Sequence, residues 1–109
     1  FNAEFITPAY TLSEIEKHKK EILEKSGLSE DEYQKLMDII FKYIKIIGPN
    51  KYNFKIDKAK RLITDLDDVV FLACAIAFNC PIWTDDKHFI EQKEIKIITT
   101  KEMIKRANE

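Results

Sequence analysis

Glycine and proline are scarce in this sequence, whose 109 residues contain two glycines and three prolines. Long flexible linkers and low-complexity tracts are therefore excluded, and no glycine-rich phosphate loop can form. A membrane-spanning segment is also missing. The longest apolar run, residues 69–78, is ten residues long, whereas a bilayer-spanning helix needs about 20. We expect this run to form a buried core helix.

Cysteine is as rare as glycine. Cys74 and Cys80 both lie in apolar surroundings and lack the second pair of ligands that a structural zinc site needs. Two thiols are also a poor disulfide framework. We therefore expect a protein of the reducing cytoplasm.

Net charge is small, at −1, so no overall basic field attracts nucleic acid. The positive charges are nevertheless unevenly distributed along the chain. An early cluster contains Lys17, Lys19 and Lys20. A second basic stretch contains Lys51, Lys55, Lys58, Lys60 and Arg61. A solvated lysine-rich surface explains both clusters, but the second is also a candidate for binding a nucleic-acid backbone.

The remaining composition, 45% apolar and 34% charged, fits one small domain over residues 1–109. Short apolar or β-branched runs predict strands at residues 4–7, 81–84 and 95–98. Helical spacing and capping residues predict helices at residues 11–25, 29–47, 57–63 and 69–78, a helical turn at 87–90 and a last helix from residue 99. The order β, α, α, α, α, β, α, β, α gives an α/β fold with a short parallel sheet flanked by helices.

Acidic residues gather where such sheets bind their ligands, beyond the carboxyl ends of the strands. The candidates are Glu14 after the first strand, Asp65, Asp67 and Asp68 at the start of the apolar helix, and Asp85 and Asp86 after the second strand. Crowded carboxylates repel one another unless a cation lies between them, and Mg²⁺ and Mn²⁺ prefer oxygen ligands. Such an ion could activate water for phosphodiester hydrolysis.

Each of these acidic groups also has a structural explanation. Glu14 fits a capping box with Thr11, and the same box is expected for Ser29 with Glu32 and for Thr99 with Glu102. Asp65 fits the N-cap of the apolar helix, and Asp85 and Asp86 fit an ordinary turn. The sequence pattern by itself leaves a metal site and a set of helix caps as alternatives.

The histidines and two aromatic residues are weaker candidates. His18 lies in a lysine-rich helix and is expected on the surface. His88, two residues after Asp86, is a candidate contact to a substrate phosphate. Trp83 and Phe89 could stack on bases, but we expect them in the core of so small a domain.

Two consecutive segments, residues 65–75 (DLDDVVFLACA) and 80–89 (CPIWTDDKHF), resemble the C-terminal half of PIN domains. In that family an acidic residue opens an alanine-rich helix, and an apolar strand then ends in Thr or Ser, one residue and Asp. VapC-type toxins and their archaeal relatives are the nearest comparison. The opening Phe5–Pro8 with Glu14, and the closing strand and helix, also fit. The resemblance covers nearly the whole chain and implies a three-layer PIN-like fold and Mg²⁺- or Mn²⁺-dependent ribonuclease activity.

The resemblance also assigns roles to individual residues. Glu14, Asp68 and Asp86 match the catalytic, metal-binding acids, and Asp65 is an auxiliary ligand. Thr84 matches the hydroxyl residue that supports the last of these acids, while Asp67 and Asp85 are adjacent alternatives. RNA is the implied substrate, and an antitoxin protein is an implied partner. The second basic stretch is our candidate for holding the RNA strand beside the cleaved bond.

The sequence departs from the family pattern at its start. A complete PIN domain begins with a central strand that ends in Asp, and no such segment precedes Phe1. We therefore expect an N-terminally incomplete domain with reduced activity. Because an exposed strand edge needs hydrogen-bond partners, we also expect a homodimer, swapped or strand-donating. A non-catalytic PIN-like module that binds RNA or protein is the competing function.

Overall fold

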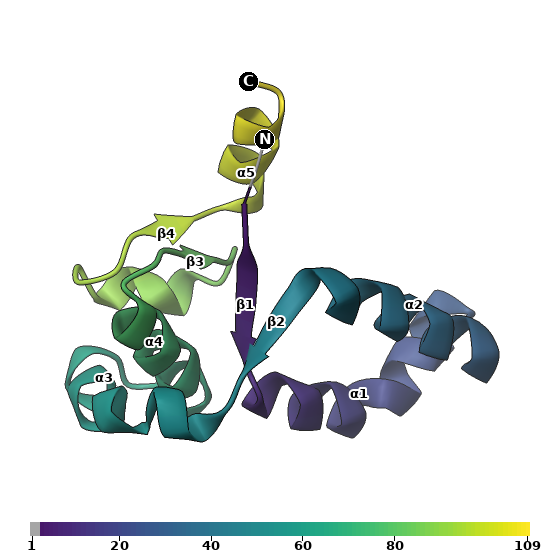
Figure 1. Ribbon diagram of the computed structural model, residues 1–109, viewed down its shortest axis with the longest axis horizontal. Helices are drawn as coiled ribbons and strands as arrows, with labels where there is room; N and C mark the ends of the chain where they lie inside the picture. Colours follow the sequence, from purple (N-terminus) through teal and green to yellow (C-terminus); the bar gives the residue numbers. More distant parts are fainter. Residues whose placement is uncertain (1–2) are drawn as a thin grey trace. The chain divides into compact units, whose positions relative to one another are not determined.

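The computed structural model describes residues 3–109 and is a mixed α/β structure (Figure 1). Within these residues the elements are β1 (Phe5–Pro8), α1 (Tyr10–Ser26), α2 (Glu30–Tyr43), β2 (Ile44–Ile47), α3 (Ile56–Leu62), α4 (Leu66–Phe78), β3 (Ile82–Trp83), β4 (Ile97–Ile98) and α5 (Thr100–Ala107). Three 3₁₀ turns, η1 (Pro49–Lys51), η2 (Asn53–Lys55) and η3 (Lys87–Glu91), complete the described part. The chain divides into two compact units, one formed by Glu4–Ile47 and the other containing Gly48–Glu109.

Strands pair in parallel within each unit, as predicted. In the first unit Phe5 pairs with Ile44 and Pro8 with Ile47, and in the second unit β3 pairs with β4. The described strands therefore form two two-stranded sheets. The sequence correctly predicted that the strands pair in parallel. It predicted one short sheet, however, where the described residues form two.

The prediction that residues 29–47 form a single helix is wrong. Helix α2 ends at Tyr43, and Ile44–Ile47 is strand β2. The isoleucines of this strand continue the apolar spacing of α2, so spacing could not separate the two elements. β-branched residues favour an extended backbone where a partner strand is present, and β1 provides that partner. Ile47 is 3% exposed and anchors the strand in the core.

Helix α1 begins without the predicted capping box. Its N-cap is Ala9, which makes no side-chain cap hydrogen bond. The Thr11 hydroxyl lies 2.6 Å from the Thr7 hydroxyl and is used in that contact. The helix ends at Gly27, whose φ of 72° allows its N–H to donate to the Leu23 carbonyl. Glu14 is therefore not a member of a helix cap.

Helix α2 begins with the capping box that the sequence predicted. The Ser29 N–H donates to Glu32 Oε1 at 3.0 Å, and the Glu32 N–H donates to Ser29 Oγ at 3.2 Å. Helices α1 and α2 form a hairpin that connects β1 to β2 (Figure 1). Lys19 of α1 joins them, because its ammonium lies 3.0 Å from Glu30 and 5.3 Å from the centre of the Tyr33 ring.

The second unit is built around α4, the apolar helix predicted from the sequence. Leu72 and Ala73 are fully buried, and Val69 and Cys74 are each 3% exposed. The helix packs against α3 and η2 and continues into β3. Both cysteines are free thiols. No helix in residues 3–109 has the length and apolarity that a membrane crossing requires.

The aromatic residues around β3 differ in burial. Phe89 of η3 is 4% exposed, so the prediction of a core position is confirmed. Trp83 is 52% exposed, so the same prediction is wrong for this residue. Its indole N–H donates to Thr100 Oγ1 at 3.1 Å. That contact holds the ring against the start of α5, where it remains open to solvent.

Candidate metal centre

Asp65 begins α4 as its N-cap, in agreement with the structural explanation considered for this residue. One carboxylate oxygen, Oδ1, accepts the N–H groups of Asp67 at 2.9 Å and Asp68 at 3.3 Å. Aspartate is favoured here because its carboxylate satisfies N–H groups that have no partner within the helix. The cap leaves the other oxygen, Oδ2, for further contacts, and this atom lies 3.9 Å from His88 Nδ1.

Asp68 lies in the first turn of α4, and its side chain is only 13% exposed. Its Oδ2 is buried and makes no hydrogen bond with any described residue, although His88 Nδ1 lies 3.5 Å away. Burial raises the pKa of Asp68, and the charges of Asp65 and Asp86 raise it further, while His88 opposes them. A carboxylate so placed is costly unless a cation compensates it.

Asp86 approaches the same place from the exit of β3. Its N–H donates to Thr84 Oγ1 at 3.0 Å, and its Oδ1 accepts the N–H of His88 at 2.9 Å. The same oxygen lies 3.4 Å from His88 Nδ1. The side chain of Thr84 thus fixes the turn that carries Asp86, and the side chain of Asp86 caps η3.

Asp85 is directed to a different partner. Its Oδ1 accepts the N–H of Thr100 at 2.8 Å, and its Oδ2 accepts the Thr100 hydroxyl at 2.6 Å. These hydrogen bonds hold the pKa of Asp85 below its usual value. Both oxygens therefore tie the end of β3 to the start of α5. Of these two acids, Asp86 is therefore the one whose carboxylate lies beside His88.

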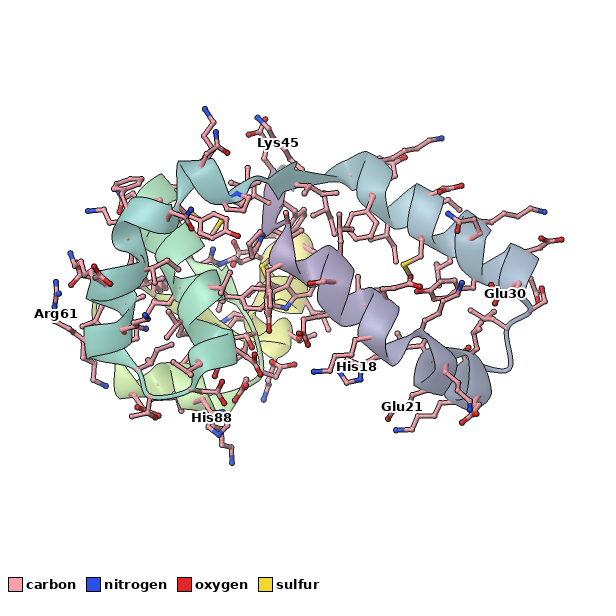
Figure 2. All side chains as sticks on the ribbon, turned by 90° about the horizontal axis from the view of Figure 1, so that it is seen from below. His18, Glu21, Glu30, Lys45, Arg61 and His88 are labelled. Carbon is pink, nitrogen blue, oxygen red and sulfur yellow. The ribbon has the colours of Figure 1, made fainter. Side chains whose placement is uncertain are left out.

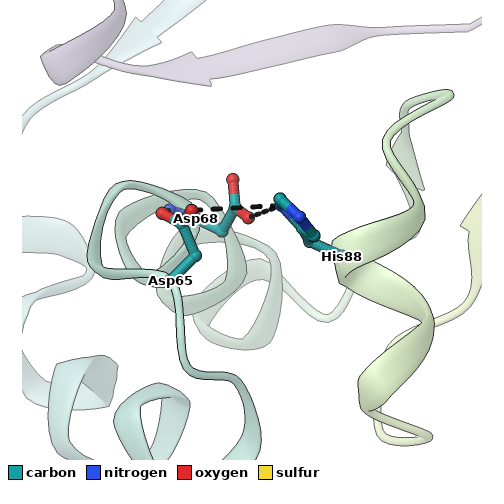
Figure 3. A group of neighbouring side chains, drawn as sticks. All are labelled: Asp65, Asp68 and His88. Carbon is teal, nitrogen blue, oxygen red and sulfur yellow. Dashed lines mark hydrogen bonds and ion pairs between the residues drawn. The ribbon is translucent and has the colours of Figure 1, made fainter.

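Asp65, Asp68 and His88 together form a group in which each residue offers one ligand atom, all within 4.8 Å of one another. Figure 3 shows the His88 ring facing the Asp68 carboxylate, with Asp65 beside it at the start of α4. The buried oxygen of Asp68 without a hydrogen bond, next to a second carboxylate and an imidazole, is a donor set that suits a divalent cation. The residues present therefore fit a metal ion.

The PIN domain family model matches residues 1–107 of the chain. The chain belongs to the PIN domain family. Membership confirms the resemblance drawn from residues 65–75 and 80–89, and PIN domains are generally nucleases. No curated protein and no solved structure matches the chain.

His88 is the member of this PIN domain's cluster that the sequence did not identify as a metal ligand. It was considered only as a phosphate contact, because of its position two residues after Asp86. The available signal was the short turn that follows an aspartate N-cap, since η3 brings the side chains of Asp86 and His88 to the same side. His18, in contrast, is half-exposed on α1, in agreement with its predicted surface position.

Asp86 borders this cluster through His88 but is not a member of it. Glu14 lies on α1 in the Glu4–Ile47 unit, with its carboxylate 3.8 Å from His18 Nε2 and its side chain 30% exposed. Figure 2 shows His18 and Glu21 on neighbouring turns of α1, and their charged groups are 3.7 Å apart. A metal-binding role of Glu14 stays a prediction.

The second basic stretch follows η1, η2 and α3 in the other unit. Arg61 is exposed and extends away from α3 (Figure 2). Lys51 and Lys60 are also exposed. Lys58 forms an ion pair with Glu94, and the Lys55 ammonium lies 5.3 Å from the centre of the Phe54 ring. The role of this stretch in binding nucleic acid also stays a prediction.

Proposed function

We propose that this PIN domain is a metal-dependent endoribonuclease that hydrolyses RNA phosphodiester bonds with Mg²⁺ or Mn²⁺. The observation that carries the proposal is the buried Oδ2 of Asp68, which accepts no hydrogen bond from residues 3–109 and faces a carboxylate and an imidazole at the start of α4. Family membership supplies the reaction class, since PIN domains are generally nucleases.

The proposed catalytic acids are Asp68, Asp86 and Glu14, with Asp65 as an auxiliary ligand. Asp68 and Asp65 are held by the first turn of α4, and Asp86 by its hydrogen bond from the backbone to Thr84. Glu14 is the acid that the family pattern assigns to α1. The three-layer PIN-like arrangement belongs to the same proposal. When bound, the divalent ion supplies the charge that activates a water molecule and stabilises the developing charge on the phosphate.

The chain's own residues account for substrate binding in the proposal. Exposed positive side chains of the second basic stretch, such as Lys51, Lys60 and Arg61, would contact phosphates of the RNA strand on either side of the cleaved bond. Such contacts position the strand without reading its sequence. A homodimer, expected because an exposed strand edge needs hydrogen-bond partners, and an antitoxin partner, expected from the family pattern, complete the proposal.

A cleavage assay tests this function with three proteins: the wild-type chain, Asp68→Asn and the matched control Asp67→Asn. Asp67 occupies the same helical turn as Asp68 but lies outside the cluster. With labelled RNA and Mn²⁺, we expect cleavage by the wild type and by the control. Asp68→Asn should lose at least about 100-fold in rate, the scale on which a single transition-state partner acts.

Removal of the metal with EDTA should abolish cleavage by every active variant. Cleavage that survives EDTA, or that is equal in Asp68→Asn and the wild type, would contradict the proposal. RNA binding by the wild type without any cleavage would instead identify a non-catalytic binding module.

A further inference from the structure

We propose that His88 is a nitrogen donor at the metal centre, so that this PIN domain prefers Mn²⁺ to Mg²⁺. The inference rests on the proposed metal-dependent function and goes beyond it, because it names a ligand that the acidic pattern of the chain does not contain. It also predicts which type of cation the site selects.

The imidazole of His88 lies beside three carboxylates. Nδ1 of His88 lies 3.4 Å from Asp86 Oδ1, 3.5 Å from Asp68 Oδ2 and 3.9 Å from Asp65 Oδ2. A single nitrogen atom therefore faces carboxylates that come from two separate segments of the chain. Among these, the oxygen of Asp68 is buried and has no hydrogen bond with any residue that the structure describes.

The backbone of η3 holds His88 next to these carboxylates. The N–H of His88 donates to Asp86 Oδ1 at 2.9 Å, and the next residue, Phe89, is 4% exposed in the core. The backbone of η3 is thus held on both sides of the ring. The side chain itself is 62% exposed, so it can turn to place a nitrogen on an ion without breaking a packed contact.

Negative charge exceeds positive charge around His88. Three carboxylates surround one imidazole, so an imidazolium offsets at most one of three negative charges. An exposed ion pair of this kind is also weak in water. A divalent cation bound by the carboxylates and by the neutral ring offsets more of the charge and gives the imidazole nitrogen a partner.

The donor set determines the preferred ion. Mg²⁺ requires nearly ideal octahedral geometry and takes oxygen ligands, with several retained waters. Mn²⁺ accepts carboxylate oxygen, as Mg²⁺ does, but it also begins the transition-metal series whose affinities for sites with nitrogen donors rise toward Cu²⁺. A centre with two or three carboxylate oxygens and one imidazole nitrogen therefore binds Mn²⁺ more tightly than Mg²⁺.

The test uses pulsed electron paramagnetic resonance of bound Mn²⁺, which detects a directly bonded ¹⁴N nucleus. The chain contains two histidines, so the variants His88→Gln and His18→Gln identify the source of any imidazole signal. Glutamine at position 88 keeps an oxygen donor of similar reach but removes the nitrogen. We expect an imidazole ¹⁴N coupling in the wild type and in His18→Gln, and its loss in His88→Gln.

Calorimetric titrations of the same proteins with Mn²⁺ and Mg²⁺ provide the second readout. In His88→Gln the Mn²⁺ affinity should fall by about 10-fold to 100-fold, the range over which supporting groups tune metal sites. The Mg²⁺ affinity should change much less, by no more than about 3-fold, because an oxygen donor remains. The preference for Mn²⁺ over Mg²⁺ is therefore smaller in His88→Gln than in the wild type.

Bound Mn²⁺ without an imidazole coupling in the wild type would overturn the assignment of His88 and leave the proposed nuclease function standing. A coupling that persists in His88→Gln and disappears in His18→Gln would overturn it too. No Mn²⁺ binding by the folded wild type would remove both this inference and the metal-dependent function on which it rests.

Discussion

Gln92 offers the most quantitative test of the structure, because it is buried and makes three hydrogen bonds to the backbone around it. Its amide Nε2 donates to the carbonyls of Phe89 at 3.1 Å and Ile95 at 2.8 Å, and its Oε1 accepts the Ile95 N–H at 2.7 Å. The residue is 5% exposed. These bonds fix the loop between η3, which carries His88, and β4.

Replacing Gln92 with Met removes the hydrogen bonds while nearly preserving the volume, so little cavity cost is added. Three buried backbone groups then lose their partners, each at roughly 1–3 kcal/mol if water cannot reach it. Because the loop lies close to the surface and water can reach part of it, we expect a total loss of about 3 kcal/mol in the free energy of unfolding.

Urea denaturation followed by circular dichroism measures this loss. The matched control is Gln34→Met on α2, because Gln34 is exposed and makes one side-chain hydrogen bond, to Asp38. We expect the control to change the free energy of unfolding by less than about 0.5 kcal/mol. A loss of under 1 kcal/mol in Gln92→Met, or a loss equal to that of the control, would refute the reasoning about this loop.

Three further predictions concern backbone strain and ionisation. Gly27→Ala should lower the free energy of unfolding by about 1 kcal/mol, because a φ of 72° disfavours a residue with a side chain. No atom lies within 4 Å of the added methyl, so a steric clash does not contribute. Thermal denaturation measures the effect, and an unchanged melting temperature would contradict it. Burial raises the pKa of Cys74 from 9.0 to about 11, so the buried thiol contributes stability below pH 9 that is lost as the pH rises toward 11, by roughly 2–3 kcal/mol in total. Urea midpoints of Cys74→Ala should fall less steeply over this range than those of the wild type, and equal slopes would argue against the assignment. Hydrogen bonds from Thr100 lower the pKa of Asp85 from 3.8, so its stabilising contribution is present above that pH and is lost as the pH falls below it. Melting temperatures of Asp85→Asn should therefore depend less on acid than those of the wild type, and a parallel acid dependence would exclude the role.

Local interactions explain which parts of the fold could be predicted from the sequence. Ser29, Asp65 and Thr99 each act as N-caps, and each contact joins residues no more than three positions apart. The apolar helix α4 was equally visible, because its composition allows only a buried position. Such features depend on neighbours in the sequence and were predicted correctly.

Features that depend on distant partners could not be predicted in this way. Strand β2 is extended because β1 pairs with it, and its isoleucines otherwise continue a helical pattern. The side chain of Thr11 is used by Thr7, so the capping box expected for α1 is absent. In both cases a tertiary contact decided between two local possibilities.

In the candidate site, too, local features were predictable and features that depend on distant partners were not. Family resemblance predicted roles for Asp68, which lies in the cluster, and for Asp86, with Asp85 as the adjacent alternative. The sequence could not show that Asp85 is used by Thr100, because that depends on where Thr100 lies. His88 joined the cluster only when the geometry of η3 was known. Residues with local roles were therefore easier to predict than residues whose role requires two segments to meet.

The central claim is that the carboxylate of Asp68 binds a divalent cation, and calorimetric titration with Mn²⁺ tests it most directly. The wild type and Asp67→Asn should bind Mn²⁺ with the same affinity, whereas Asp68→Asn should bind at least about 10-fold more weakly. Circular dichroism should show that all three proteins are folded. Equal Mn²⁺ affinity in Asp68→Asn and the wild type would contradict the claim.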